Sequence, residues 1–260
     1  MALFICVVNH NHDKIIYSNE TLKNLASIHT VFIKSNTVAT SELINYCEDS
    51  GIHLLQGKKR QGFGTNNNEV FTHINSKFKI KKSDYFLVLN PDIQIQLNEI
   101  NKLLDVTIKM KNNVSTINLF KDPTFTTHEN SIRRYPKPLT PIKSIFGLKR
   151  NDFYNKSKIT TPKIVDWASG SFLLFNISCY QKLGGFDENY FMYFEDVDIC
   201  TRANRIGIDI VYYPHIKGIH YASHQNRKIF SIHFIWYCKS AIRYHSKYNL
   251  TFLKQLKLIK

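Results

Sequence analysis

Carboxylate side chains stand at two places in this sequence where they could do chemistry, and the first is Asp92. It follows the apolar run Tyr85–Leu89 through the turn residues Asn90 and Pro91. Such a run is typical of a buried strand, and in open α/β sheets ligands bind beyond the carboxyl ends of the strands. We therefore expect Asp92 to lie where a ligand or metal ion binds, with an ordinary Asn-Pro-Asp turn as the alternative.

The second place is an acidic cluster of Glu195, Asp196 and Asp198, directly after the aromatic run Tyr190–Phe194. Neighbouring carboxylates repel one another and apolar surroundings raise their pKa, so one of them can become a proton acceptor. The alternative is capping of a helix, because acidic side chains interact favourably with a helix N-terminus. Both can hold at once if Glu195 or Asp198 caps the helix while Asp196 faces a cleft.

Two weaker signals accompany the carboxylates. His220 belongs to a group of three histidines in ten residues, and a neutral imidazole can complete the ligand shell of a divalent cation held mainly by oxygens. Gly62-Phe63-Gly64 precedes Thr65 and three asparagines. Small residues that open a helix expose backbone N–H groups to a phosphate or nucleoside, although the spacing is not that of the dinucleotide fingerprint.

The elements that must position these residues follow an alternating pattern up to residue 120. Short β-type runs alternate with amphipathic runs, which is the signature of β-α-β units and a largely parallel sheet. Strands are expected at Leu3–Val8, Val31–Lys34, Ile52–Leu55, Tyr85–Leu89 and Val114–Phe120. Helices are expected at Asp13–Ser27, Ser41–Ser50, Thr65–Phe78 and Leu97–Lys111.

The second half of the chain begins with an irregular stretch. Residues 121–163 are rich in proline, threonine and basic residues, and a loop of this length in a compact domain is usually functional or mobile. The elements expected after it are an interrupted strand at Ile164–Phe175, a turn at Gly184-Gly185, a helix ending at Ile206, a strand at Ile208–Tyr213 and a helix beginning near Arg227.

We therefore expect residues 1–226 to form one domain, whose two halves are 1–120 and 164–226, separated by the basic insertion 121–163. Residues 227–260 are expected to form a basic, aromatic helical tail packed on it. The chain of 260 residues is 43% apolar, enough for one large core.

Charge and cysteine usage narrow the class of protein. The formal net charge of +15 attracts nucleic acid, anionic lipid or phosphorylated substrates, unless it is only a solvated basic surface. Five cysteines without a C-x-x-C pair indicate a reducing compartment and neither a disulfide framework nor a zinc site. Ala2–Val8 is expected to be a strand rather than a signal peptide, and any membrane contact is expected to be peripheral.

Taken in order, the motifs resemble those of the family 2 inverting glycosyltransferases, and most closely the bacterial rhamnosyltransferases of O-antigen and cell-wall assembly. The residues that carry the resemblance are Gly62-Phe63-Gly64 with Asn67-Asn68, Leu89-Asn90-Pro91-Asp92, Asp166-Trp167 with Gly170-Ser171, Gly185-Phe186-Asp187 with Glu195-Asp196-Val197-Asp198, and His220. The resemblance runs from Leu3 to about Lys247. It implies the GT-A fold, an α/β, Rossmann-like architecture with a mixed, mostly parallel sheet flanked by helices.

The resemblance also implies the roles of individual residues. Asp92 and His220 would hold Mg²⁺ or Mn²⁺, which neutralises the departing nucleoside diphosphate. Asp196 would be the general base that takes the proton from the acceptor hydroxyl, with inversion at the anomeric carbon. The implied donor-binding residues are Asn9, Asn36, Gly62, Phe63, Gly64, Asn67, Asn90 and Asp92. The implied acceptor-binding residues are Asp166, Trp167, Gly170, Ser171 and Glu195. Lys239 and Arg243 are added to them because the basic tail described below could guide a lipid-diphosphate acceptor toward Asp196.

The substrates that the resemblance implies are dTDP-β-L-rhamnose as donor and an undecaprenyl-diphosphate-linked glycan as acceptor. The protein would then be cytoplasmic and peripheral on the inner face of the bacterial plasma membrane. The same fold could instead transfer N-acetylglucosamine, galactofuranose or glucose. A nucleic-acid-binding protein is a more distant alternative, because the sequence contains no helix-turn-helix, zinc-finger or RNP pattern.

The basic tail offers a surface for the membrane. Lys239, Arg243 and Lys247 are spaced four apart and would share one helical face. The segment Arg227–Lys247 also contains Phe230, Phe234, Trp236, Tyr237 and Tyr244. Aromatic residues of this kind suit a headgroup interface, so we expect this helix to touch an anionic membrane surface. The alternative is a helix packed on the sheet with a solvated basic edge.

Overall fold

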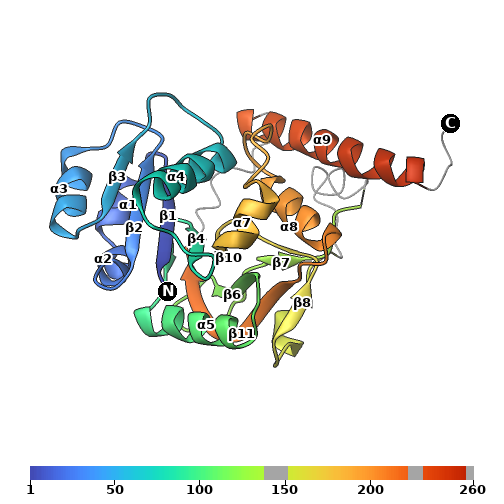
Figure 1. The fold of residues 1–260 in the computed structure, drawn as a ribbon, viewed down its shortest axis with the longest axis horizontal. Helices are drawn as coiled ribbons and strands as arrows, with labels where there is room; N and C mark the ends of the chain where they lie inside the picture. Colours follow the sequence, from blue (N-terminus) through green and yellow to red (C-terminus); the bar gives the residue numbers. More distant parts are fainter. Residues whose placement is uncertain (138–151, 222–230, 256–260) are drawn as a thin grey trace.

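A mixed nine-stranded sheet forms the centre of the protein, in a computed structural model that describes residues 1–137, 152–221 and 231–255 (Figure 1). Eight strands lie in the order β3-β2-β1-β4-β10-β6-β11-β5, and β8 pairs with β11. The pairs of β1 with β2 and β4, of β2 with β3 and of β6 with β11 are parallel, while β10 runs antiparallel to β4 and β6. The predicted α/β class with a mixed, mostly parallel sheet is therefore confirmed.

The strands are short and mostly apolar. Their bounds are β1 Leu3–Asn9, β2 Thr30–Ser35, β3 His53–Gln56, β4 Tyr85–Leu89, β5 Ile93–Gln94, β6 Val114–Phe120, β8 Lys163–Val165, β10 Phe172–Asn176 and β11 Ile210–His220. All seven residues of β1 are buried, because helices cover both faces of the sheet. Alternate residues of β1 enter two different cores, with Leu3 and Ile5 in one and Phe4 and Cys6 in the other.

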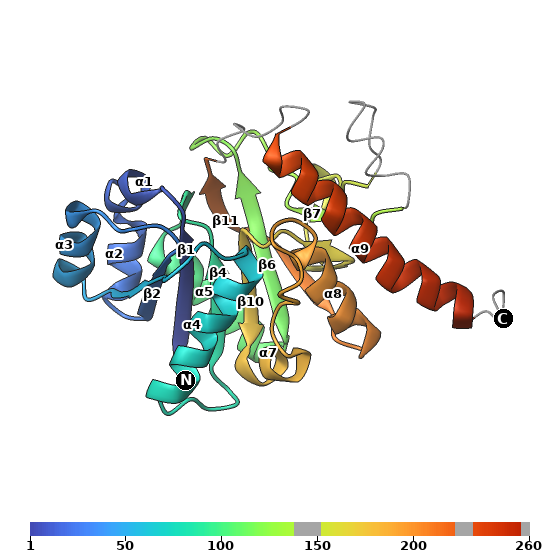
Figure 2. The same cartoon turned by 90° about the horizontal axis from the view of Figure 1, so that it is seen from above.

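The helices form one layer on each face of the sheet (Figures 1 and 2). One layer contains α1 Asp13–Tyr17, α2 Glu20–Ala26, α3 Ser41–Asp49 and α5 Leu97–Lys109. The other contains α4 Phe63–Lys77, α7 Ile177–Leu183, α8 Glu195–Arg205 and α9 Ile232–Gln255. This second layer matters for function, because α4, α8 and α9 surround the cleft described below.

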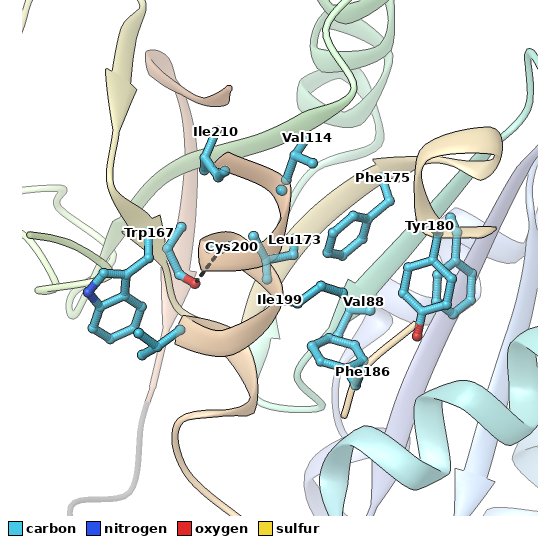
Figure 3. Packing of buried hydrophobic residues seen from close by; sticks show 14 of the residues in the cluster. Val88, Val114, Trp167, Leu173, Phe175, Tyr180, Phe186, Ile199, Cys200 and Ile210 are labelled. Carbon is cyan, nitrogen blue, oxygen red and sulfur yellow. Dashed lines mark hydrogen bonds between the residues drawn. The ribbon is translucent and has the colours of Figure 1, made fainter. Parts of the chain in front are cut away.

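The core under the second layer combines aromatic and aliphatic side chains, as Figure 3 shows. Tyr180 lies 4.9 Å from Phe86 and 5.2 Å from Phe175, ring centroid to ring centroid. Cys200 is buried beside the carbonyl of Ala168, and burial raises the pKa of its thiol to about 12. These contacts fix α7 and α8 on the sheet, and α8 carries the acidic cluster.

Several elements differ from the prediction. The expected helix Asp13–Ser27 is two helices, because the side chain of Asn19 accepts a hydrogen bond from the Thr21 N–H and starts α2. The interrupted strand becomes β8, β10 and the short β9 Trp167–Ala168, which pairs with β7 Ile132–Arg133 in a small second sheet. Within the insertion, Lys156–Lys158 form a 3₁₀ turn.

The last strand is longer than predicted. β11 shifts register between Tyr213 and Lys217 and continues to His220, so His220 ends a strand instead of following one. The helix expected from near Arg227 is observed from Ile232, and residues 222–230 lie outside the described residues.

Candidate active site

A cleft of about 490 Å³ opens where the carboxyl ends of the parallel strands face the start of α8. This is the edge of the sheet where open α/β folds bind ligands. Its polar and charged lining residues are His10, His12, Asn36, Arg60, Gln61, Asn66, Asn90, Asp92, Arg133, Ser169, Ser171, Glu195, Asp196 and His220. Asp92 and Asp196 thus line one cleft.

Asp92 and His220 meet because β5 pairs with the end of β11. His220 lies opposite Ile93 in the ladder, and the Tyr221 N–H donates to the Asp92 carbonyl at 3.1 Å. The side chains then approach to 3.1 Å between Asp92 Oδ1 and His220 Nε2. On the other side of the ring, His220 Nδ1 lies 2.9 Å from Glu129 Oε2. The imidazole therefore bridges two carboxylates.

The pKa values of His220 and Asp92 are set by their burial and by the ion pairs that they form. Burial alone would lower the pKa of His220, but the hydrogen bonds and charges of Asp92 and Glu129 outweigh it and raise that pKa to about 10. For Asp92, burial acts in the opposite direction and raises the pKa. The hydrogen bond and charge of His220 outweigh this effect, so the pKa of Asp92 is lowered overall. With only protein groups around it, His220 is a cation between two anions.

The same residues fit a divalent cation. Neighbouring ligands of an octahedral Mg²⁺ at about 2.1 Å lie about 3.0 Å apart, which is close to the 3.1 Å between Asp92 Oδ1 and His220 Nε2. A metal-bound histidine commonly donates its second N–H to a carboxylate, as Nδ1 could to Glu129. No group of three His, Cys, Asp or Glu side chains that could hold a metal occurs in the described part of the chain. Two protein ligands would leave the remaining positions to a bound diphosphate and water.

Asp196 lies at the start of α8 with both carboxylate oxygens held by backbone. Oδ2 accepts from the Gly170 N–H at 3.1 Å and Oδ1 from the Val197 N–H at 2.8 Å. Burial raises the pKa of Asp196, and these two hydrogen bonds with the charge of Arg133 offset only part of the rise. The result is a carboxylate that is more basic than an exposed aspartate and fixed in orientation.

Glu195 sits beside it and is almost fully buried. Burial and the neighbouring Asp196 charge raise the pKa of Glu195 well above its ordinary value. Its Oε2 has no hydrogen-bond partner in the described structure. Because Asp196 accepts two backbone N–H hydrogen bonds that stabilise its charge, while Oε2 of Glu195 accepts none in the described structure, we assign the proton of this pair to Glu195 and the negative charge to Asp196.

The approach to α8 has an unusual backbone. Tyr193 and Phe194 both have positive φ, at 70° and 65°, in the left-handed region that residues with a Cβ rarely occupy. Such residues cost on the order of 1–3 kcal/mol each and cluster at functional sites. Here they turn the chain directly before Glu195, so that the acidic cluster starts the helix at the wall of the cleft.

Comparison with known proteins decides the family. Over 246 residues the chain is 33% identical to rhamnosyltransferase WbbL of Escherichia coli (strain K12), covering 93% of this chain and 92% of that protein. The chain belongs to the WbbL-like glycosyltransferases. No model of a protein family matches this glycosyltransferase.

Two further relatives agree with this assignment. A low-salt glycan biosynthesis hexosyltransferase, Agl10 of Haloferax volcanii, is 29% identical over 84% of this chain and 66% of its own length. An N-acetylglucosaminyl-diphospho-decaprenol L-rhamnosyltransferase of Mycobacterium tuberculosis is 32% identical over 54% of this chain and 48% of its own length.

Solved structures support the fold. GalNAc-T7, determined with UDP, GalNAc and Mn²⁺, superimposes with a TM-score of 0.59 at 13% identity, over 84% of this chain and 43% of that one. Staphylococcus aureus TarS 1–349 gives 0.56 at 11% identity, over 85% and 60%. The predicted GT-A fold and the predicted membership among rhamnosyltransferase-like glycosyltransferases are both confirmed.

The cleft of this glycosyltransferase gathers most of the residues predicted from the sequence. Those that line it are Asn36, Phe63, Asn90, Asp92, Trp167, Gly170, Ser171, Glu195, Asp196 and His220. Asn36 holds the loop that precedes α4, because its side chain both donates to the Gln61 carbonyl and accepts from the Gln61 N–H. The buried Oγ of Ser171 has no hydrogen-bond partner in the described structure, so it is available to a ligand.

Four of the predicted donor-binding residues lie behind the cleft lining. Asn9 is fully buried and donates to Asp13 and Ser35. Glycine is required at 62 and 64 for packing, because an added Cβ would lie 2.6 Å from the Phe191 carbonyl oxygen or 2.8 Å from the Phe186 Cβ. Asn67 donates to the Phe63 carbonyl.

Asn66 takes the place in the cleft that was predicted for Asn67. Its amide nitrogen donates to the Gly62 carbonyl, and its buried Oδ1 has no partner in the described structure. The helix begins at Phe63 rather than at Thr65, and Asn66 rather than Asn67 lines the cleft.

Asp166 was predicted to bind the acceptor, but its carboxylate is engaged elsewhere. It accepts from the Tyr135 N–H and the Tyr154 hydroxyl, both at 2.9 Å. These bonds hold the strand that carries Trp167, whose indole N–H donates to the Arg134 carbonyl at 2.9 Å. Asp166 therefore supports the cleft wall and does not line it.

Lys239 and Arg243 were predicted to bind the acceptor, and neither lines the cleft. Lys239 is exposed on α9. Arg243 lies 3.1 Å from Asp187 Oδ2, and Lys247 binds Asp187 at 2.9 Å and Asp198 at 2.7 Å. Two of the three basic residues expected to face a membrane thus hold α9 against the body of the protein.

Three further residues of the site lie in irregular segments, where the sequence pattern does not predict the direction of a side chain. Glu129 and Arg133 belong to the insertion, whose lack of periodicity gave no indication of where their side chains point. Arg133 stacks 5.1 Å above the Trp167 ring and lines the cleft. Arg60 lines it from the loop before α4. Only the basic character of these two segments could have drawn attention to them.

Proposed function

We propose that this glycosyltransferase moves L-rhamnose from dTDP-β-L-rhamnose to a lipid-diphosphate-linked saccharide, with inversion, in the assembly of a surface polysaccharide such as O-antigen. Similarity to WbbL over nearly the full length of both proteins supports the sugar. The name of the mycobacterial relative supports a polyprenyl-diphosphate-linked acceptor, here undecaprenyl diphosphate. The observation that carries the proposal is the single cleft lined by Asp92, His220 and Asp196.

The donor side of the reaction belongs to Asp92 and His220. These two residues would hold Mg²⁺ or Mn²⁺, and such an ion neutralises the charge of the leaving nucleoside diphosphate. With a cation bound, Glu129 would accept the Nδ1 proton of His220 and would leave the Nε2 lone pair of the neutral imidazole for that cation. Glu129 is therefore a positioning residue, since it acts through His220.

The acceptor side belongs to Asp196. Its carboxylate takes the proton of the acceptor hydroxyl while that oxygen forms a bond to the anomeric carbon, and the bond from that carbon to the diphosphate oxygen breaks on the opposite face. The N–H groups of Gly170 and Val197 hold the carboxylate in one orientation without protonating it. Trp167 lines the cleft, and its ring offers an apolar wall to a sugar face.

The place of action follows from the acceptor. A lipid-linked acceptor and a nucleotide-sugar donor meet at the cytoplasmic face of the bacterial plasma membrane, so we place the protein there as a peripheral protein. The net charge of +15 favours that surface, because its anionic lipids attract basic proteins. No helix in the described ranges is both long and apolar enough to span a bilayer.

A donor panel tests the proposal. The protein is incubated with Mg²⁺ or Mn²⁺, a short-chain lipid-diphosphate saccharide and one nucleotide sugar at a time, and nucleoside-diphosphate release is measured. We expect dTDP release from dTDP-rhamnose and an α-rhamnoside product by NMR. Preference for a hexose, N-acetylglucosamine or galactofuranose donor would establish the second candidate, which the similarity to a hexosyltransferase favours.

A further inference from the structure

The inner face of helix α9 packs against the body of the protein and forms part of the cleft wall. Ala241, Tyr244 and Tyr248 are buried against the body, and the Tyr248 hydroxyl donates to Asp198 at 2.7 Å. Tyr237 lines the cleft from the same face. The helix lies along one side of the molecule, next to α8 (Figure 2).

The outer face of α9 is an apolar stripe. Ile232, Ile235 and Ile242 are 52%, 44% and 69% exposed, and Lys239 is exposed among them. Their spacing of three, four and three residues places all four on one side of a helix, roughly opposite Tyr237 and Tyr244. Such a stripe is unusual on a helix whose other side is already packed, because a helix needs only one apolar face for its core.

Exposed basic residues belong to the loop before α4, which contacts the first turns of α9. The Arg60 guanidinium lies 5.0 Å from the Trp236 ring centroid and 5.7 Å from that of Phe191, which ties the loop before α4 to the first turns of α9. Lys58 and Lys59 are exposed on the same loop. Apolar side chains flanked by lysine and arginine are the pattern of a helix that lies in an anionic lipid interface.

We propose that the outer face of α9 docks on an anionic bilayer, with Ile232, Ile235 and Ile242 entering the headgroup region. This deepens the proposed function, on which it rests for its purpose, since a lipid-linked acceptor is presented at such a surface. It replaces the surface expected from the sequence, because Arg243 and Lys247 are bound to Asp187.

A second copy of the chain fits this face less well than lipid does. A stable interface takes about 800 Å² from each partner, and three partly exposed isoleucines on one helix offer much less. An isologous contact would also bring Lys239 of each copy into the same apolar seam, where like charges are costly. At a bilayer the same lysine reaches anionic headgroups while its stem lies along the isoleucines.

Docking in this way has a consequence for the reaction. Tyr237 lines the cleft from the opposite side of α9, and a helix with its side chains is about 10 Å across. The cleft wall is then held about one helix diameter from the headgroups. A saccharide on a membrane-bound diphosphate could reach Asp196 from there without leaving the bilayer.

Vesicle binding of the full chain tests the inference. The variant I232S/I235S/I242S is compared with I28S/I44S/I108S, which changes three isoleucines that are 62%, 39% and 41% exposed near the helices of the opposite layer. Vesicles contain phosphatidylcholine alone or with anionic phosphatidylglycerol. We expect wild type and the control variant to bind anionic vesicles, and the α9 variant to bind at least about ten-fold more weakly, since each apolar group withdrawn from the interface weakens partitioning.

Two results would overturn the inference. One is α9-variant binding equal to wild type, with thermal unfolding showing both variants folded. The other is a wild-type dimer in sedimentation that the α9 variant loses, without vesicle binding by either protein. Transfer to a short-chain acceptor in free solution should be unchanged in the α9 variant. If wild type binds vesicles but transfers no sugar from any donor, the proposed function fails and the docking surface stands.

Discussion

Glu129 and His220, which are 91 residues apart in the chain, meet through a 2.9 Å contact between a carboxylate oxygen and Nδ1 of the imidazole. Glu129 comes from the irregular insertion, and His220 from the end of β11. The contact fixes which ring nitrogen faces Asp92. The insertion therefore contributes to the donor side of the cleft through a side chain that need not touch the donor.

Substituting Glu129→Gln should weaken divalent-cation binding by about 10- to 100-fold, because loss of a carboxylate partner lowers the basicity and order of a ligating histidine. Binding of Mn²⁺ in the absence of substrates, followed by electron paramagnetic resonance, measures this directly. The control is Glu48→Gln, on the exposed side of α3. Equal Mn²⁺ affinity in Glu129→Gln and wild type would remove the positioning role.

Glu195 makes the protein less stable as pH rises. Its pKa is raised in the folded state, so above the ordinary glutamate pKa the folded protein binds more protons than the unfolded chain, and the free energy of unfolding falls with increasing pH. Glu195→Gln removes this titration. We expect the variant to melt at higher temperature than wild type at pH 8, with the difference shrinking towards pH 4. A difference that is constant over this range would show that Glu195 titrates normally.

Asp198 anchors α9. It is fully buried and accepts from Arg202, Lys247 and Tyr248, each at 2.7 Å. Asp198→Ala should lower the free energy of unfolding by about 3 kcal/mol, because removing one partner leaves the others uncompensated. Urea denaturation measures the loss, and Asp105→Ala on the exposed side of α5 is the control. A loss no larger than in the control would mean that the network contributes little.

The sequence was most informative where chemistry coincides with the end of a regular element. Asp92 follows an apolar strand, which places it at the ligand-binding edge of the sheet, and the resemblance to glycosyltransferases implied that Asp196 faces the same cleft. The position of Glu129 could not be predicted, because its segment has no periodicity and its partner His220 lies on a distant strand. The four-residue spacing shows that Lys239, Arg243 and Lys247 lie near one face of a helix, but it does not show where that face points.

Ion pairs with residues remote in sequence determine where this face of α9 points. Asp187 and Asp198 attract Arg243 and Lys247 towards the body, so the face presented outward is the isoleucine stripe. Asn66 and Asn67 are a second example in which packing, and not spacing, decides the direction of a side chain. The way in which α4 packs on the sheet decides that Asn66 lines the cleft and that Asn67 does not.

Donor binding, measured separately from transfer, tests the central claim that Asp92 and Asp196 serve opposite ends of one reaction. Calorimetry of dTDP-rhamnose with Mn²⁺ is compared for wild type, Asp92→Asn and Asp196→Asn, beside single-turnover transfer. We predict that Asp196→Asn binds donor like wild type but transfers about 10²- to 10⁴-fold more slowly, and that Asp92→Asn loses the Mn²⁺-dependent part of donor binding. Wild-type transfer by Asp196→Asn, or unchanged Mn²⁺-dependent binding by Asp92→Asn, would contradict the account.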